Sequence, residues 1–250
     1  MSAVSAAESQ ALMVPIELAC GVVAGPMFVA TFTVIGARRA GYDWRGHAVS
    51  SLADGRGGWV QRANFIVTGA LYCAAANGLA RSSKHAAEPR AVRALIFGAG
   101  AGLVGSGLFV TDPVAGFPPA SCDHDDADHT PSLAPTGEGR LHNLCAIPIF
   151  AGTPVAALIC ATHAARRGQY RWALYSAGSA VAMTGAFARF GAAFGGAPQL
   201  AGSGGLWQRI SIATGFGWLS ATSLRALRSN IQSRLEPRRR RCRIRGRLGG

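Results

Sequence analysis

The amino-acid sequence predicts an all-α integral membrane protein, a bundle of six transmembrane helices. Of its 250 residues, 49% are hydrophobic and only 15% are charged, which is far from the composition of a soluble domain. Apolar stretches of about 20 residues, the length that crosses a bilayer as a helix, recur along the chain. Clusters of arginine separate these stretches, as they do in polytopic membrane proteins.

The net charge of +13 does not indicate nucleic-acid binding, because ten of the 25 Lys and Arg residues lie in the segment 225–250. A basic segment after the last span is typical of the cytoplasmic side, where it contacts anionic lipid headgroups. The six cysteines contain no C-x-x-C pair, so we expect neither a zinc knuckle nor a disulfide framework. The expected partner is the lipid bilayer, and the oligomeric state stays open.

The first span is expected from about Leu18 to Gly36, after an N-terminal segment of residues 1–17. Gly21 and Gly25 form a G-x-x-x-G face, which is typical of close contact with another membrane helix. The second span is expected from about Trp59 to Leu79.

The third span is expected from Ala94 to Val110. Within it, Gly100, Gly102 and Gly105 match the G-x-G-x-x-G pattern of dinucleotide sites. We reject that interpretation, because the glycines lie inside an apolar run without the helix and second strand of a βαβ unit. Small-residue packing between membrane helices explains Gly98 and Gly102 with fewer assumptions.

A polar loop from Pro113 to Gly139 follows the third span. Four aspartates and two histidines between Cys122 and His129, including the acidic run Asp123 to Asp128, could hold a divalent cation loosely. The stretch lacks the pattern of a calcium loop, which favours a solvated loop. The fourth span is expected to end near Thr162, with Pro148 and Pro154 as kinks.

The fifth span is expected from Trp172 to Phe194 and the sixth from Leu206 to Leu224. The transmembrane domain then covers residues 18–224, and the basic segment 225–250 is expected to be a disordered cytoplasmic tail. Together with the loops 81–93 and 166–171, this tail carries 17 Lys and Arg residues. The positive-inside rule then places both termini in the cytoplasm of a multi-pass protein of the cell membrane.

Polar side chains gather at the opposite, outward end of the predicted spans. If Gly46 to Leu52 is helical, His47 projects from the same face as Ser50 and Ser51, which follow it by three and four residues. Arg189 lies roughly 10 Å inside the fifth span, where a lone charge is costly, and Asp112 is its expected partner. We infer an outward-facing polar pocket, lined by His47, Ser50, Ser51, Gln61, Arg62, Asp112, His142, Arg189 and Arg209.

Four successive segments carry a resemblance to a known family. They are GHAVSSLADGRGGWVQRANFIVTGAL, LFVTDPVAGFPP, GRLHNLCAIPIFAG and GLWQRISIATGFGWL. Over about Val14 to Leu227 the chain resembles the domain-of-unknown-function 998 (DUF998) membrane proteins. The resemblance implies a six- or seven-helix integral membrane protein without an established activity.

More distantly, the chain is similar to the membrane hydrolase superfamily of alkaline ceramidases and progestin and adiponectin receptors. That similarity implies a zinc ion held by His47, Asp112 and His142, with Ser50 or Ser51 orienting a water molecule. The order departs from that superfamily, because here the serine follows its histidine and the last two predicted spans contain no histidine.

Three functions therefore stay open, and whether the chain is an enzyme is one of the open questions. The first is a metal-dependent hydrolase of a lipid or lipid-linked substrate, with Arg62, Arg189 and Arg209 binding an anionic headgroup. The second is a small-molecule transporter or binding protein, although the sequence contains no internal repeat. The third is a non-catalytic scaffold, in which the same polar groups pair with each other and with backbone carbonyls at helix ends.

Overall fold

The structure, a computed structural model, describes residues 3–82, 89–114, 117 and 136–248, and within these ranges the side chains from 13 to 235. These residues are almost entirely helical, and the prediction of an all-α protein is confirmed. The main elements are α1 (Ala3–Arg38), α2 (Trp59–Arg81), α3 (Arg90–Leu108), α4 (Gly137–Ile147), a π-helical segment (Pro148–Gly152), α5 (Thr153–Arg166), α6 (Tyr170–Phe194) and α7 (Gly204–Leu248).

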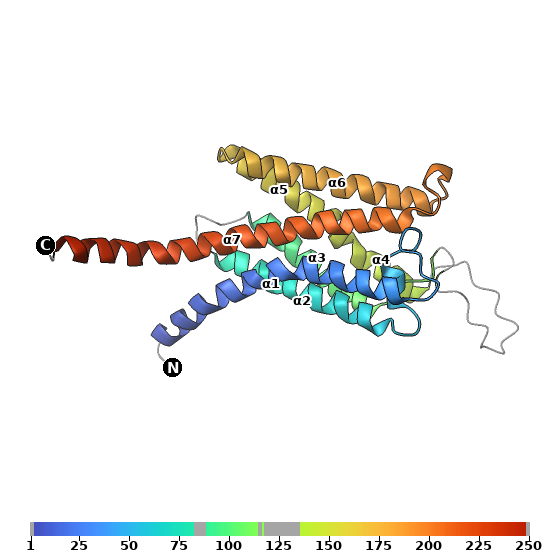
Figure 1. Cartoon of the computed structure of the whole chain (residues 1–250), viewed down its shortest axis with the longest axis horizontal. Coiled ribbons are helices and arrows are strands. Elements are labelled where there is room, and N and C mark those ends of the chain that lie inside the picture. The colour runs from blue at the N-terminus through green and yellow to red at the C-terminus, as the bar shows by residue number, and fades with distance from the viewer. Residues whose placement is uncertain (1–2, 83–88, 115–116, 118–135, 249–250) are drawn as a thin grey trace, which may run out of the picture.

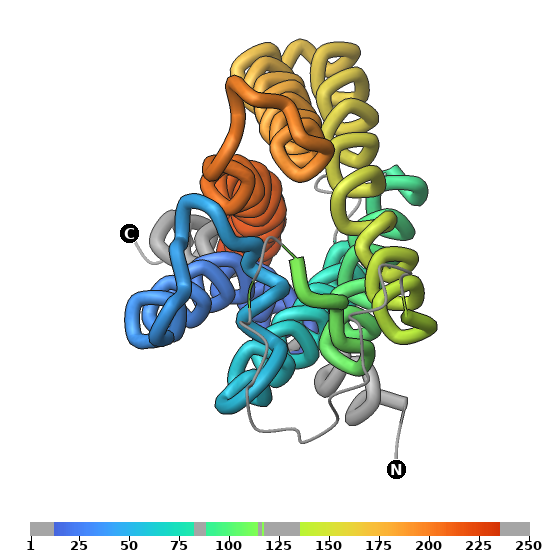
Figure 2. The backbone as a smooth tube through the Cα atoms, turned by 90° about the vertical axis from the view of Figure 1, so that its right-hand side faces the viewer, coloured from blue at the N-terminus to red at the C-terminus, as the bar shows by residue number. Residues whose placement is uncertain are grey.

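The helices run up and down beside one another, with α4, the π-helical segment and α5 forming one continuous rod (Figure 1). The connections α1–α2 and α6–α7 and the first turn of α4 lie at one end, which we call the loop end. Both termini leave the bundle at the opposite end. Each helix packs against the next in the chain, and α7 packs against α1, so the helices form a closed ring (Figure 2).

Four of these helical stretches are long and apolar enough to cross a membrane. They are Met13–Arg38, Trp59–Arg81, Arg90–Leu108 and Gly137–Arg166. Their bounds agree with the first four predicted spans to within a few residues. The helices α6 and α7 are also long, but they are richer in small and polar residues and do not meet the same criterion within the described residues.

Small residues allow the helix backbones to approach closely, as the G-x-x-x-G pattern predicts. A Cβ atom on Gly21 would overlap the hydroxyl of Ser223, and one on Gly25 would lie 2.9 Å from the carbonyl oxygen of Phe216. The Ser220 hydroxyl donates a 3.2 Å hydrogen bond to the Gly21 carbonyl. The two glycines of α1 therefore form the seam along which α7 closes the ring.

The glycine-rich run of α3 also allows neighbouring helix backbones to approach closely. Its G-x-G-x-x-G pattern lies inside the helix and not in a turn from strand to helix, so the rejection of a dinucleotide site agrees with the structure. A Cβ on Gly100 would lie 2.7 Å from the carbonyl oxygen of Gly69 in α2, and one on Gly102 would lie 2.9 Å from Pro148 Cγ. Pro148 has no amide N–H, and the π-helical segment begins at this residue.

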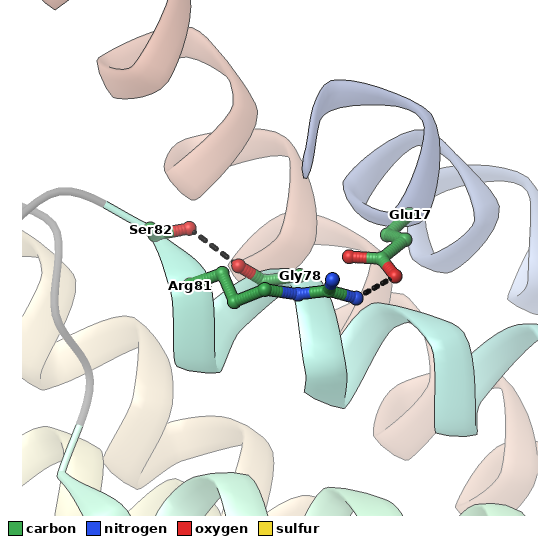
Figure 3. A network of polar contacts seen from close by, with 4 residues as sticks. All are labelled: Glu17, Gly78, Arg81 and Ser82. Atoms are coloured by element: carbon green, nitrogen blue, oxygen red, sulfur yellow. Dashed lines mark hydrogen bonds and ion pairs between the residues drawn. The ribbon is translucent and has the colours of Figure 1, made fainter. Parts of the chain in front are cut away.

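An ion pair joins α1 to α2 near the end of the bundle that carries the termini. Arg81 donates a hydrogen bond to Glu17, whose side chain is only 11% exposed (Figure 3). It is the one ion pair in the described part of the chain. A carboxylate so deep between helices requires such a partner, because a lone buried charge is strongly unfavourable.

Two predictions concern the C-terminal segment and the acidic run. We expected a disordered tail beyond Leu224, but α7 continues without interruption to Leu248. The acidic run Asp123 to Asp128 lies outside the described residues, so the expectation of a solvated loop stays a prediction.

Candidate functional site

His47 lies in a turn at the loop end and not in a helix. The predicted helix Gly46–Leu52 is replaced by a short 3₁₀ helix, Ser50–Ala53, so His47 does not share a helical face with the serines. The backbone N–H of Asp43 donates a 2.9 Å hydrogen bond to His47 Nδ1, and the ring stacks on Phe117 with centroids 5.0 Å apart. Because Nδ1 accepts, a neutral ring carries its proton on Nε2. In this arrangement neither nitrogen offers a free lone pair to a metal ion.

His142 has the opposite tautomer. It lies in the second turn of α4, is buried, and places Nδ1 3.0 Å from the carbonyl oxygen of Phe109. A carbonyl can only accept, so Nδ1 donates and the lone pair of the neutral ring lies on Nε2. Of the two histidines predicted as ligands, only His142 therefore retains the chemistry of a base or a metal ligand.

Asp112 is bound to the N-terminus of α4. Its Oδ1 accepts a 2.6 Å hydrogen bond from the Thr136 hydroxyl, and its Oδ2 accepts one of 3.1 Å from the Thr136 backbone N–H. Thr136 is itself the N-cap of α4, accepting a bond from the Gly139 N–H. A carboxylate at this position also interacts favourably with the helix dipole.

Two expectations about Asp112 are not met. It does not pair with Arg189, whose guanidinium lies 4.7 Å from the ring centroid of Trp207 in a cation–π contact. Among the described residues, no three His, Cys, Asp or Glu side chains gather as a metal site would require. His47, Asp112 and His142 thus do not fit a shared zinc ion in this structure.

Two of the three arginines predicted to bind substrate, Arg62 and Arg209, donate to the backbone at the loop end. Arg62 donates from Nε to the carbonyl of Gly107 at 3.1 Å and from a terminal nitrogen to that of Leu108, at the C-terminus of α3. Arg209 donates to the carbonyls of Trp44 (2.6 Å), Gly205 and His47, and to the Tyr42 hydroxyl. Arg62 therefore joins α2 to the end of α3, and Arg209 holds the 42–47 turn against α7.

Arg209 and Tyr42 affect each other's chemistry. Burial raises the pKa of the Tyr42 phenol above its ordinary value of 10.0, and the Arg209 guanidinium opposes that shift in part. The neutral hydroxyl accepts from Arg209 and can donate to the Ala48 carbonyl, 3.0 Å away. This pair fixes the turn that carries His47.

A cavity of 640 Å³ opens between the α4–α5 rod and α6, and we call it the lateral cavity. Most of its polar residues come from segments near the loop end, while its deeper walls are apolar apart from Thr184 of α6. Phe150 of the π-helical segment stacks on Phe187 of α6, with ring centroids 4.3 Å apart, and both line the cavity. The lining residues are Ala48, Ser50, Thr111, Val114, His142, Asn143, Ala146, Ile147, Phe150, Ala151, Pro154, Val155, Leu158, Thr184, Phe187, Phe190 and Gln208.

The lateral cavity contains only part of the predicted site. Ser50 and His142 line it, whereas His47, Ser51, Asp112 and the three predicted arginines do not. Ser51 is buried, and its hydroxyl has no hydrogen-bond partner among the residues that the structure describes. The expected outward-facing polar pocket is thus a largely apolar cavity with polar groups toward one end.

Gln208 is a lining residue that our site prediction omitted. Its side-chain oxygen accepts a 2.6 Å hydrogen bond from the Val49 N–H, which attaches the loop with Ser50 to α7. Its position beside Arg209, at the entry to a predicted span, was the signal available. The apolar lining residues gave no such signal, because the sequence does not distinguish an apolar side chain that faces lipid from one that faces a cavity.

The comparisons with known proteins agree with the fold. A family described as a protein of unknown function (DUF998) matches residues 22–225, which cover all the long helices except the first half of α1 and the second half of α7. Searches of curated proteins and of solved structures gave no significant match. With its apolar helices and this match over most of its length, the chain is a multi-pass integral membrane protein that belongs to the DUF998 family.

Proposed function

We propose that the protein binds an amphipathic molecule, a lipid or a lipid-linked compound, in the lateral cavity. The observation that carries this proposal is the combination of apolar, exposed walls with hydrogen-bonding groups toward one end. Ile147 and Leu158 line the cavity and are 56% and 47% exposed. In a membrane these side chains would face acyl chains, so a lipid tail can enter from the side without crossing water.

The dimensions suit such a ligand. His142 and Leu158 lie sixteen positions apart on the same rod, about 24 Å at 1.5 Å per residue, against a hydrocarbon core of about 30 Å. A volume of 640 Å³ falls within the range of small-molecule sites. The polar end offers hydroxyl, imidazole and amide groups from Ser50, His142 and Gln208, and none of the described lining residues is Lys, Arg, Asp or Glu. We expect a headgroup recognised by neutral hydrogen bonds.

This proposal is tested with a photoactivatable phospholipid and the full chain in nanodiscs. Ala151 lines the cavity, and Ala151→Trp fills it, so labelling of α5 and α6 residues at the cavity should fall severalfold. Ala182, which is exposed on α6 and does not line the cavity, supplies the matched control Ala182→Trp. Equal labelling of both variants and the wild type would refute the proposal.

Hydrolysis of the bound lipid is a second candidate, favoured by the position of His142. Its Nε2 lone pair and the Ser50 hydroxyl belong to residues that line the same cavity, so His142 is the group suited to act as a base there. Conversion of a lipid to its hydrolysed products that is lost in His142→Gln, while photolabelling persists, would support catalysis. Labelling without any turnover would leave binding as the function.

We further propose that α6 and α7 also span the membrane, which makes six spans with both termini in the cytoplasm of the cell. The helix α7 packs against the first of the four apolar spans and α6 against the fourth, and an even number of crossings brings the termini to one end. That end carries the arginines of the positive-inside pattern, among them Arg81, Arg93 and Arg166. Cysteine labelling should find position 57 accessible from outside and position 168 only after permeabilisation.

A further inference from the structure

A second cavity, of 520 Å³, lies at the loop end between the end of α1 and the start of α7, and we call it the arginine cavity. Two guanidinium groups, those of Arg39 and Arg209, line it together with Thr33, Ala37, Tyr42 and Trp44. Gln208 lines the lateral cavity and its neighbour Arg209 lines this one, so α7 presents consecutive residues to two separate sites.

Neither guanidinium is neutralised by a described residue. Within the described ranges no carboxylate lines the arginine cavity, and the single ion pair there, Arg81 with Glu17, lies toward the opposite end of the bundle. The carboxylate of Asp43 accepts from the backbone N–H groups of Arg45 and Gly46, at 2.9 and 3.1 Å, and that of Asp54 accepts from the Gly55 N–H at 2.6 Å. Two positive charges therefore share one cavity without a counter-ion from the described part of the protein.

Both guanidiniums are also held in position. Arg39 donates to the carbonyls of Asp54 (2.8 Å) and Arg56, and its guanidinium lies 5.7 Å from the ring centroid of Phe117. Arg209 is fixed by three carbonyls and the Tyr42 hydroxyl. Carbonyl groups orient the two side chains but contribute no negative charge. Binding of an anion in the cavity therefore requires little further loss of side-chain conformational entropy from the two arginines.

We propose that the arginine cavity binds a phosphate-class anion, through charge-assisted hydrogen bonds from Arg39 and Arg209. Trp44, which is half exposed on the lining, suits a position at the membrane interface, where lipid phosphates lie. The phosphate could belong to a lipid headgroup or be free in solution, since the chemistry of recognition is the same. This inference does not depend on lipid binding in the lateral cavity.

The test changes the charge inside the cavity without touching the arginines. Ala37 lines the cavity and is exposed, so Ala37→Glu places a carboxylate there, while Ala37→Gln adds the same bulk without charge. Ala40 is exposed in the same stretch but does not line the cavity, so Ala40→Glu is the matched charge control. Retention of phosphatidylglycerol from phosphatidylcholine nanodiscs is measured by native mass spectrometry, and inorganic phosphate is titrated against the full chain in neutral detergent.

We expect Ala37→Glu to weaken anion binding by about tenfold or more, whereas Ala37→Gln and Ala40→Glu stay within about twofold of the wild type. Retention of phosphatidylglycerol without phosphate binding would identify a lipid headgroup, and saturable phosphate binding without lipid retention would identify a free anion. The proposal is overturned if the wild type binds neither, if Ala37→Glu binds as the wild type does, or if Ala37→Gln loses as much as Ala37→Glu. Thermal unfolding of each variant establishes that the fold is retained.

Discussion

The carboxylate of Asp112 is bonded to both the hydroxyl and the backbone N–H of Thr136, at 2.6 and 3.1 Å, so the two ends of the intervening polar loop meet at the start of α4. A residue predicted from the sequence as a metal ligand and as the partner of Arg189 thus stabilises a helix terminus.

Asp112→Ala should lower the free energy of unfolding by about 1–2 kcal/mol, because the variant loses two hydrogen bonds and a favourable charge at a helix N-terminus. Asp112→Asn should lose less, since its amide oxygen can still accept from the Thr136 hydroxyl. Unfolding by titration with a denaturing detergent measures both changes. If Asp112→Asn instead loses bound zinc at unchanged stability, the metal role predicted from the sequence would be favoured.

Gly21→Ala should destabilise the bundle by about 1–3 kcal/mol, because the added methyl group would overlap Ser223 of α7 and lie 2.6 Å from the Ala75 side chain of α2. Gly178 is the matched control: it lies inside α6, and a Cβ there meets no atom within 4 Å. Gly178→Ala should therefore be neutral or stabilising by about 0.5–1 kcal/mol. Equal effects of the two substitutions on the unfolding midpoint would refute the proposed seam.

The ion pair between Glu17 and Arg81 should contribute measurable stability. Glu17→Gln is expected to cost roughly 1–3 kcal/mol, less than the loss for a fully buried pair, because the Arg81 side chain is 40% exposed. Arg81→Met should cost a similar amount, and the double variant should cost less than the two single losses added together. Arg90→Met, at an exposed position of α3, is the control. Additive losses would mean that the two charges do not interact.

Stability should fall at alkaline pH through Tyr42. The folded protein holds the phenol proton more tightly than the unfolded chain, because burial raises the pKa of Tyr42 above 10.0. This contribution is complete below the ordinary pKa and is lost as the pH rises through the higher folded value. Unfolding midpoints measured from about pH 8 to 11 should decline less steeply in Tyr42→Phe than in the wild type. Identical slopes would contradict the assignment.

The helices could be predicted because each lies in a long apolar or small-residue run bounded by arginines, prolines or glycines. The seam at Gly21 and Gly25 was also readable, since only small residues permit backbone contact in a membrane. The continuation of α7 beyond Leu224 was missed because a high density of arginine was taken as a sign of disorder.

The candidate site was less accessible to sequence reasoning. The sequence analysis interprets polar residues at helix ends as a shared pocket, but many of them bind backbone carbonyls at the end of a neighbouring helix, as Arg62 does for Gly107 and His142 for Phe109. The same types of polar side chain bond the unpaired backbone groups at helix termini and bind ligands. The direction of each side chain, which a single sequence does not contain, separates the two.

The contact of Gly21 with Ser223 joins the beginning of the bundle to its last helix. During synthesis α7 is made last. The glycine face of α1 therefore lacks this partner until nearly the whole chain has been made and inserted. Until α7 is in place, Gly21 and Gly25 lack the helix that packs against them and closes the ring. A truncation before α7 would therefore leave a membrane-inserted but open bundle, with a surface suited to capture by quality-control proteases.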